Sequence, residues 1–270
     1  MKVLRDPVGA GDADDADARG SVVTIGAFDG VHLGHRAVLR LVRELADARG
    51  LQAALVTFDR HPAEIVRPES APKLLTTLEH RIELLDAIGL LDVGVVLTFD
   101  EARSHESAED FVQEVLVGLL RARLVVVGAD FHFGHKRGGN VPMLERMGAD
   151  LGFEVLGLGL VAPADDSVPF SSTRVRELLA AGDVEGAATV LGRPHELRGT
   201  HADGALTVHP RLCVPAAGRY EGTLTEGEGP VRPVTIAVGE GGGEPGVLAI
   251  RAAVDAAGTP AAVRFVRRSG

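Results

Sequence analysis

The chain has 270 residues, of which 45% are hydrophobic and 24% charged, and its formal net charge is −10. This composition is typical of a folded globular protein, and the length allows one medium and one small domain. The negative charge argues against non-specific nucleic-acid binding, which requires a basic surface, although local anion sites remain possible. No run of about 18 apolar residues is present that would span a membrane.

The single cysteine, Cys213, excludes an intramolecular disulfide and is typical of a reducing compartment. Lys2 and Arg5 are not followed by an apolar stretch, so we expect no signal peptide. These features predict a cytoplasmic protein without a membrane partner. The sequence leaves its oligomeric state open.

Residues 1–20 are acidic and rich in small side chains, without periodicity, so they predict a disordered leader. From Val22 onward, strand-like and helix-like segments alternate. The predicted strands are 22–25, 51–58, 93–98, 124–127 and 153–158. The first predicted helix has an apolar stripe over 38–45 and is ended by Gly50, and Ser107 is expected to cap a helix that runs to about Arg121. The other predicted helices are 76–88, 141–152, 171–181 and 184–191. This alternation predicts an α/β fold with a Rossmann-like, doubly wound parallel sheet over residues 21–192.

After Gly192, short alternating runs stand between breaks rich in glycine and proline. The predicted strands there are 205–208, 234–238, 247–250 and 262–266, and residues 239–246 are expected to form a loop. The pattern predicts a small, mostly β, barrel-like domain over residues 193–270.

The stretch 22–40, VVTIGAFDGVHLGHRAVLR, combines a strand, a glycine-containing turn and the start of a helix. Glycines let the backbone approach a ligand closely, and the free amides of a helix N-terminus favour anions. The turn residues Gly26, Phe28, Asp29 and Gly30 and the pair His32 and His35 therefore predict a phosphate site. Two alternatives are a metal-binding histidine pair and two unrelated surface histidines.

A second motif, SSTRVR at 171–176, places hydroxyls at a helix N-terminus and arginines within its first turns. Ser172, Thr173, Arg174 and Arg176 are suited to holding a polyphosphate, although an ordinary helix cap with exposed arginines has the same pattern. Together with the histidine motif, it predicts a nucleoside triphosphate site.

Two further loops follow predicted parallel strands and are expected at the same edge of the sheet. The loop GADFHFG with GGN contains Asp130 and Asn140 and is suited to a base and ribose, or is a mobile surface loop. Phe58 and Asp59 end another strand, where a phenylalanine packs on a flat ring or belongs to the core. His80 and His105 are expected to face solvent, and no role is assigned to them.

Four segments, GAFDGVHLGH, VTFDRHPAEIVRP, VVVGADFHFGHKRGGN and SSTRVRELLAAGDVEGAATVLGRP, resemble the bacterial FAD synthetases over residues 21–194. Members of that family combine an FMN adenylyltransferase domain of the HxGH nucleotidyltransferase superfamily with a riboflavin kinase β-barrel. The resemblance implies that ATP and FMN are converted to FAD and pyrophosphate, with Mg²⁺.

The resemblance also implies roles for individual residues. His32 and His35 would contact the ATP phosphates, and Ser172, Thr173 and Arg176 would hold the departing pyrophosphate. Asp130 and Asn140 would lie near the nucleotide or flavin, and Phe58 and Asp59 would belong to the flavin side. His32, His35 and Arg176 are the predicted catalytic residues.

The sequence departs from the family pattern at several points. Ala27 stands where the family commonly has Asn, and Arg60 where it commonly has Pro. The C-terminal part has no counterpart of the Gly-Phe-Pro-Thr-Ala-Asn segment of the kinase domain, so we predict a degenerate domain without kinase activity. Two alternatives stay open: a nucleotidyltransferase with another nucleotide or acceptor, and a non-catalytic flavin or nucleotide sensor.

Overall fold

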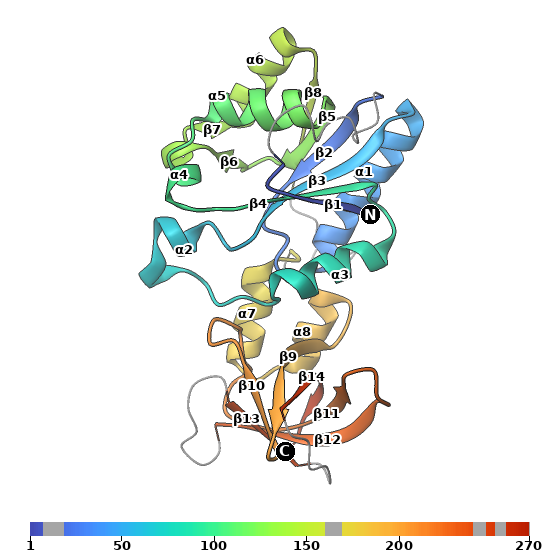
Figure 1. Cartoon of the computed structure of the whole chain (residues 1–270), viewed down its shortest axis with the longest axis vertical. Helices are drawn as coiled ribbons and strands as arrows, with labels where there is room; N and C mark the ends of the chain where they lie inside the picture. The colour runs from blue at the N-terminus through green and yellow to red at the C-terminus, as the bar shows by residue number, and fades with distance from the viewer. Residues whose placement is uncertain (8–18, 160–168, 240–246, 252–257, 270) are drawn as a thin grey trace. The chain divides into compact units, whose positions relative to one another are not determined.

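The computed structural model describes residues 1–7, 19–159, 169–239, 247–251 and 258–269 (Figure 1). Its contacts divide the chain into two compact units. The first comprises Met1–Pro72 and Leu78–Pro169, and the second comprises Lys73–Thr77 and Phe170–Gly270. No helix in these ranges is both long and apolar enough to cross a membrane.

A parallel sheet forms the centre of the first unit. Its strands are β1 (Lys2–Arg5), β2 (Ser21–Ile25), β3 (Gln52–Phe58), β4 (Val93–Leu97), β5 (Ala122–Gly128) and β8 (Glu154–Leu158). They lie in the order β1-β4-β3-β2-β5-β8, and every neighbouring pair is parallel. The predicted doubly wound parallel sheet is therefore confirmed.

Helices surround this sheet and join its strands. They are α1 (Leu33–Arg49), α2 (Ala63–Val66), α3 (Leu78–Ile88), α4 (Glu101–Ser104), α5 (Ala108–Phe111), a π-helical continuation of α5 (Val112–Leu119) and α6 (Val141–Leu151), with short 3-10 turns at Pro68–Ser70 and His135–Arg137. A two-stranded hairpin, β6 (His132–Phe133) and β7 (Gly139–Asn140), lies between β5 and α6.

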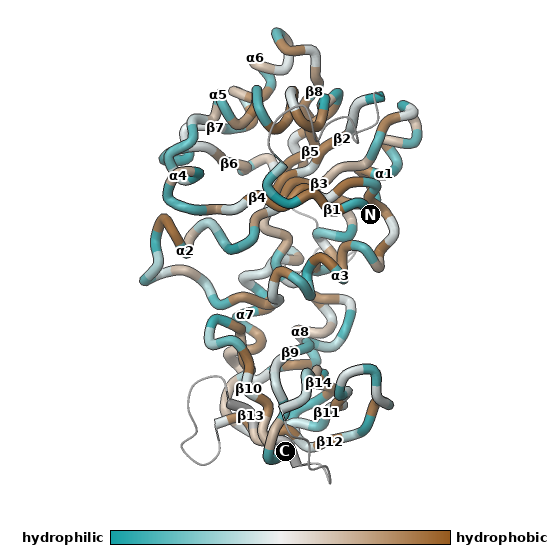
Figure 2. The backbone as a smooth tube through the Cα atoms, in the orientation of Figure 1, coloured by the Kyte–Doolittle hydropathy of each residue, from teal (hydrophilic) through white to brown (hydrophobic). Residues whose placement is uncertain are grey.

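The sheet buries both of its faces. Val22 of β2 packs with Leu39 of α1 in one apolar cluster, whereas the next residue, Val23, packs with Leu116 in another. Successive side chains of a strand point to opposite faces, so a strand covered on both sides must be apolar throughout. Every residue of β2 and β4 is buried, and Figure 2 colours the central strands largely as hydrophobic.

Two predictions for the first unit need correction. The expected leader is wrong at its start, because Lys2–Arg5 forms β1 and pairs with β4. The strand has charged residues at both ends, which hides its apolar centre from a composition argument. Residues 8–18 of that leader lie outside the described residues. The helix predicted from Thr76 begins at Leu78 instead.

The second unit contains α7 (Ser172–Ala180), α8 (Val184–Leu191) and a closed barrel with the strand order β10-β13-β12-β11-β14-β9. Its strands are β9 (His195–Ala202), β10 (Ala205–Val208), β11 (Gly218–Glu226), β12 (Arg232–Val238), β13 (Val247–Arg251) and β14 (Thr259–Arg268). The predicted barrel-like domain is thus present, with β9 and β11 as strands that the sequence did not indicate. The loop predicted at 239–246 lies, after Gly239, outside the described residues.

The boundary between the units also differs from the predicted one at residue 192. Val175 and Leu179 of α7 and Leu191 of α8 share an apolar core with Leu197, Tyr220 and other barrel residues. The two helices therefore belong to the barrel unit. Cys213 is buried in the same core, as expected for a small apolar filler.

Candidate functional site

The turn between β2 and α1 has an unusual backbone. Phe28, Gly30 and Val31 have φ values of 49°, 79° and 42°. Positive φ is rare for residues other than glycine and is especially unfavourable for a β-branched one such as Val31. Such strain persists only where the surrounding structure enforces it, and it is concentrated at functional sites.

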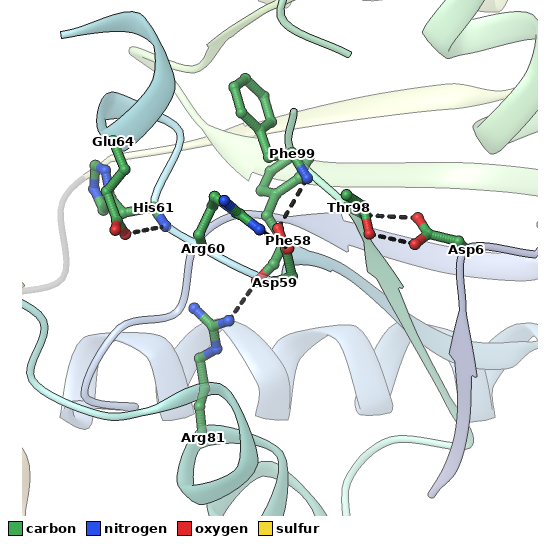
Figure 3. Close-up of polar contacts among 9 residues, drawn as sticks. All are labelled: Asp6, Phe58, Asp59, Arg60, His61, Glu64, Arg81, Thr98 and Phe99. Carbon is green, nitrogen blue, oxygen red and sulfur yellow. Dashed lines mark hydrogen bonds and ion pairs between the residues drawn. The ribbon is translucent and has the colours of Figure 1, made fainter. Parts of the chain in front are cut away.

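Buried contacts hold this turn in place. Arg81 of α3, only 3% exposed, donates from Nη1 to the Ala27 carbonyl at 2.7 Å and from Nη2 to the Phe58 carbonyl. Burial lowers the pKa of Arg81, and the carboxylates of Asp29 and Asp59 oppose that shift. Figure 3 shows Arg81 reaching the end of β3. The guanidinium thus joins the turn after β2 to the end of β3.

His32 caps the N-terminus of α1. Its ring is only 5% exposed, and its Nδ1 accepts a hydrogen bond from the His35 amide at 3.3 Å. A backbone amide can only donate, so Nδ1 of His32 uses its lone pair there. A neutral His32 therefore carries its proton on Nε2.

His35 lies against His32 and Phe28. The two imidazoles are stacked with their centroids 3.6 Å apart, and the Phe28 ring is 4.6 Å from that of His35. Nδ1 of His35 is shielded from solvent and has no hydrogen-bond partner among the described residues. Burial holds the pKa of His35 well below its usual value, and the neighbouring His32 and Arg81 lower it further. The ring is therefore neutral at pH 7.

The histidine pair follows β2, at a position of the sheet that is characteristic of ligand sites. β2 lies between β3 and β5, and the chain continues from β2 toward one edge and later from β5 toward the other. The crevice outside the carboxyl ends of the strands at such a switch point is where open α/β sheets bind ligands. The N-terminus of α1 opens at this point and favours an anion.

A cavity of about 890 Å³ lies at the same edge of the sheet. Its walls include the last residue of β2, Ile25, and the last residue of β3, Phe58. Its aromatic lining consists of Phe58, Phe99, Phe111, Phe131 and Phe133. The Phe58 and Phe99 rings meet edge to face at 5.3 Å, and the Phe131 and Phe133 rings are stacked at 5.4 Å. A cavity with such walls is suited to a flat aromatic ligand.

Asp59 adjoins this cavity through its neighbour Phe58. One carboxylate oxygen accepts from the Phe99 amide at 2.9 Å, and the other accepts from Arg60 at 3.0 Å (Figure 3). Burial raises the pKa of Asp59, but the hydrogen bonds from Arg60 and Phe99 outweigh it, so the pKa lies below its usual value. Arg60, which departs from the family pattern, thus forms an ion pair with this predicted site residue.

The loop after β5 contributes a wall rather than a cluster of polar groups. Asp130 is exposed, and the Asn140 side chain caps α6 by accepting from the Met143 amide at 3.0 Å. Gly134 and Gly139 pack the β6–β7 hairpin against Ala108, where an added Cβ would lie 2.7–2.8 Å from the nearest Ala108 atoms. Asn140 therefore has a helix-capping function in addition to the predicted contact with a ligand.

The remaining predicted residues lie in the second unit. Ser171, not Ser172 or Thr173, is the N-cap of α7 and accepts from the Arg174 amide at 3.1 Å. Arg174 pairs with Glu177 at 3.5 Å, and Nε of Arg176 donates to the Lys73 carbonyl at 2.6 Å. Because the units are described separately, the predicted role of these residues beside the histidine pair stays a prediction.

Sequence reasoning missed Arg81 and a group of histidines in the cavity wall. The cavity is lined by His61, His105, His132 and His135. Arg81 gave no signal because it lies within an ordinary amphipathic helix. The histidines are far apart in the sequence, before α2, after α4 and in the β6–β7 hairpin. His80, expected to face solvent, is only 3% exposed. Across the described ranges, no group of three or more His, Cys, Asp or Glu residues is arranged to hold a metal ion.

Comparison with known proteins gives consistent matches. The family model described as FAD synthetase matches residues 14–174. A bifunctional riboflavin kinase/FMN adenylyltransferase of Haemophilus influenzae is 37% identical over 181 residues, which cover 67% of this chain and 58% of that protein. The protein of the same name from Escherichia coli K12 is 33% identical over 219 residues, which cover 80% and 68% of the two chains. The chain thus spans less than two thirds of the Haemophilus relative.

Among solved structures, the crystal structure of a macrolide-efflux protein from Streptococcus pneumoniae matches with a TM-score of 0.80. The match covers 100% of this chain and 91% of that one, at 21% identity. At this level of identity the likeness concerns the fold alone.

Proposed function

This chain belongs to the FAD synthetase family, and we propose that it transfers AMP from ATP to FMN to give FAD and pyrophosphate. The observation that carries the proposal is the strained turn bearing His32 and His35, which lies at the same sheet edge as the phenylalanine-lined cavity. The turn is suited to phosphates and the cavity to a planar ring. Both belong to the first unit.

The reaction needs little acid–base chemistry. An oxygen of the FMN phosphate attacks the α-phosphorus of ATP, and the bond from that phosphorus to the α,β-bridging oxygen breaks. The FMN phosphate is already ionised at neutral pH, so no general base has to remove a proton. Catalysis then rests on in-line positioning and on stabilising the charge of the α-phosphate and of pyrophosphate.

The histidine pair supports this chemistry through neutral donors. His32 caps α1 through Nδ1, so the proton of its neutral ring lies on Nε2, and we propose that this N–H donates to a phosphate oxygen when ATP binds. His35 has a buried Nδ1 without a partner in the described part of the chain, and a buried polar atom left unsatisfied costs about 1–3 kcal/mol. We propose that bound ATP supplies the missing interaction.

The aromatic cavity is the proposed flavin site. Phe58 and Phe131 provide faces against which the isoalloxazine ring packs, and Asp59 is held as an ionised acceptor by Arg60 and Phe99. The resemblance to the family also assigns Ser172, Thr173 and Arg176 to the departing pyrophosphate. That assignment stays a prediction.

We propose that Mg²⁺ enters with ATP. This ion prefers oxygen ligands and is commonly bound by one or two carboxylates together with substrate phosphates. We expect the ATP phosphates to supply most of its ligands.

The test is a product analysis. The full chain is incubated with FMN, ATP and Mg²⁺, and the flavins and pyrophosphate are separated and quantified. Equal amounts of FAD and pyrophosphate support the proposal. Binding of both substrates without turnover supports the sensor alternative, and another adduct, or turnover with CTP only, supports a different nucleotidyltransferase.

A further inference from the structure

Arg81 is a buried cation that bonds the backbone of both proposed substrate sites. It lies in α3 and is only 3% exposed. Nη1 donates to the Ala27 carbonyl at 2.7 Å, and Nη2 donates to the Phe58 carbonyl. Ala27 directly precedes Phe28, the first residue of the turn with positive φ, and the Phe58 ring lines the aromatic cavity. One side chain thus contacts both the turn that bears the histidine pair and the cavity wall.

The shape of the guanidinium fixes the relation between these two carbonyls. Its N–H donors form a rigid planar fork, so neither carbonyl can shift by about 1 Å without lengthening or breaking a hydrogen bond. Thr57 of β3 adds a second link, because its hydroxyl donates to the Ala27 carbonyl at 3.3 Å. Figure 3 shows the guanidinium directed toward the end of β3. The turn after β2 and the end of β3 are therefore held in one arrangement.

Packing alone does not require an arginine at this position. Leu85, one helical turn further along α3, lies in the apolar core cluster that includes Leu39. Residues four apart share a helix face, so an apolar side chain at position 81 would extend that core. Burying a charge is costly, and exchanging a buried ion pair for well-packed apolar residues is often neutral or stabilising. What the arginine adds is the bond to each of the two carbonyls.

The turn needs such support because its backbone is strained. Phe28 and Val31 have positive φ, a conformation that persists only where the surrounding structure enforces it. The bond from Arg81 acts on the residue directly before this strained stretch. In return, the carboxylates of Asp29, in the turn, and of Asp59, after β3, favour the charge of Arg81. The turn and the guanidinium therefore stabilise each other.

We propose that Arg81 is a positioning residue for adenylyl transfer, which fixes the phosphate turn relative to the aromatic cavity and so aligns FMN with the α-phosphorus of ATP. This role rests on the proposed function, because it assumes that each site holds its own substrate. In-line attack requires the reacting atoms to approach within about 3–3.5 Å, and a misplacement of about 1 Å costs on the order of a hundredfold in rate. Arg81 acts through the two carbonyls and not on the reacting atoms.

The test compares R81M with R43M in steady-state FAD formation by the full chain, with ATP and FMN varied in turn. Each variant replaces a guanidinium with an unbranched apolar side chain. Arg43 of α1 is the matched control, because it also links a helix to β3. Its Nη1 pairs with Asp92 at 2.7 Å, and Asp92 accepts from the Ala53 amide at 2.8 Å. Ala53 lies near the start of β3, at the opposite end of that strand from Phe58. Thermal denaturation measures the stability of each variant.

We expect R81M to lower kcat at least about tenfold while both KM values change less than about threefold, since each site keeps its own contacts. R43M should change kcat less than about twofold, because it leaves the two carbonyls in place. R81K should recover part of the lost kcat, since an ammonium keeps donors for the carbonyls without the rigid fork.

If R81M does not fold, T57V takes its place, because it removes the other donor to the Ala27 carbonyl. In T57V, kcat should fall about threefold at unchanged KM. The role of Arg81 is overturned if R81M, or T57V in its place, lowers kcat no more than R43M does, or if the loss appears only in KM. A wild type that forms no FAD overturns the proposed function and the role of Arg81 with it. In an active wild type, the other outcomes overturn the role of Arg81 alone.

Discussion

His32 and His35 share one stacked arrangement but differ in what their ring nitrogens do. Nδ1 of His32 caps α1, so the position of this ring is fixed by the fold. Nδ1 of His35 has no hydrogen-bond partner in the described part of the protein. Burial, together with the neighbouring His32 and Arg81, lowers the pKa of His35 and keeps its ring neutral. A structure built for stability alone would have satisfied that nitrogen or replaced it with an apolar group. We therefore expect a ligand contact at His35, because its unpartnered nitrogen lies at the turn that the proposal assigns to phosphates.

Replacing either histidine of the proposed phosphate site should reduce turnover strongly. We expect H35A and H32A each to cost about 2–4 kcal/mol of transition-state stabilisation, the usual effect of removing a donor to a developing charge. FAD formation under saturating substrates measures it. H32A should also lower the melting temperature, because it removes the α1 cap at a cost of about 1 kcal/mol. Unchanged turnover in both variants would contradict the assignment.

The pH dependence of stability offers a second test of His35. Its pKa in the folded chain lies below the unfolded value of about 6.5, so below that pH the unfolded state binds more protons. Stability should therefore be fully present above pH about 6.5 and fall as the pH decreases. Calorimetry between pH 7.5 and 5.5 should show a steeper loss for the wild type than for H35Q, by up to about 1 kcal/mol per pH unit. Equal slopes would show that His35 is not held neutral by the fold.

At the scale of elements, the β6–β7 hairpin forms one wall of the aromatic cavity because glycine lets it approach α5. Gly134 has φ +71°, and a Cβ there would lie 2.7 Å from the Ala108 amide nitrogen. A side chain at position 134 would be strained by the positive φ and would also clash with Ala108. The stacked Phe131 and Phe133 rings depend on that approach, since Phe133 belongs to the hairpin.

Substituting Gly134 should therefore damage the cavity more than an equivalent change elsewhere. Gly50, the C-cap of α1, has φ +64° but no atom within 4 Å of an added Cβ, so G50A carries only the conformational cost of about 1 kcal/mol. G134A adds a clash with backbone, and we expect about 3 kcal/mol of destabilisation with weaker FMN binding. Chemical denaturation and quenching of FMN fluorescence measure the two effects. Equal losses in G134A and G50A would contradict this account.

Local patterns predicted the elements that carry strong periodicity or caps. Gly50 ends α1 and the Ser107 side chain caps α5 as expected, because these signals involve only neighbouring residues. β1 escaped detection because its strand character comes from pairing with β4, far along the chain. The strand, turn and helix around His32 were predicted from sequence, but the contacts of Arg81 and the ring contact between His105 and His135 were not. Their partners lie in other elements, so only the folded chain brings them together.

At the scale of the whole molecule, the second unit engages two of its carboxylates in ion pairs. Among the described residues, each unit also has a buried histidine nitrogen without a hydrogen-bond partner, Nδ1 of His35 in the first and Nε2 of His201 in the second. In the barrel, Glu196 pairs with both Arg198 and Arg264 at 2.7 Å, and Glu226 pairs with His201 and Arg232. A carboxylate such as Glu196, held between two arginines, is poorly placed to bind Mg²⁺ or to accept a proton. The barrel fold alone does not imply an activity.

We therefore expect the chain to lack riboflavin kinase activity, although relatives such as the Escherichia coli protein are named as bifunctional. The second unit retains the barrel core around Tyr220 and Phe265, but the sequence has no Gly-Phe-Pro-Thr-Ala-Asn segment to supply nucleotide and magnesium contacts. The full chain is incubated with riboflavin, ATP and Mg²⁺, and FMN and FAD are quantified. A parallel reaction that starts from FMN shows that the same preparation is active. FAD should form only from FMN, and any FMN made from riboflavin would show that the barrel supplies those contacts through other residues.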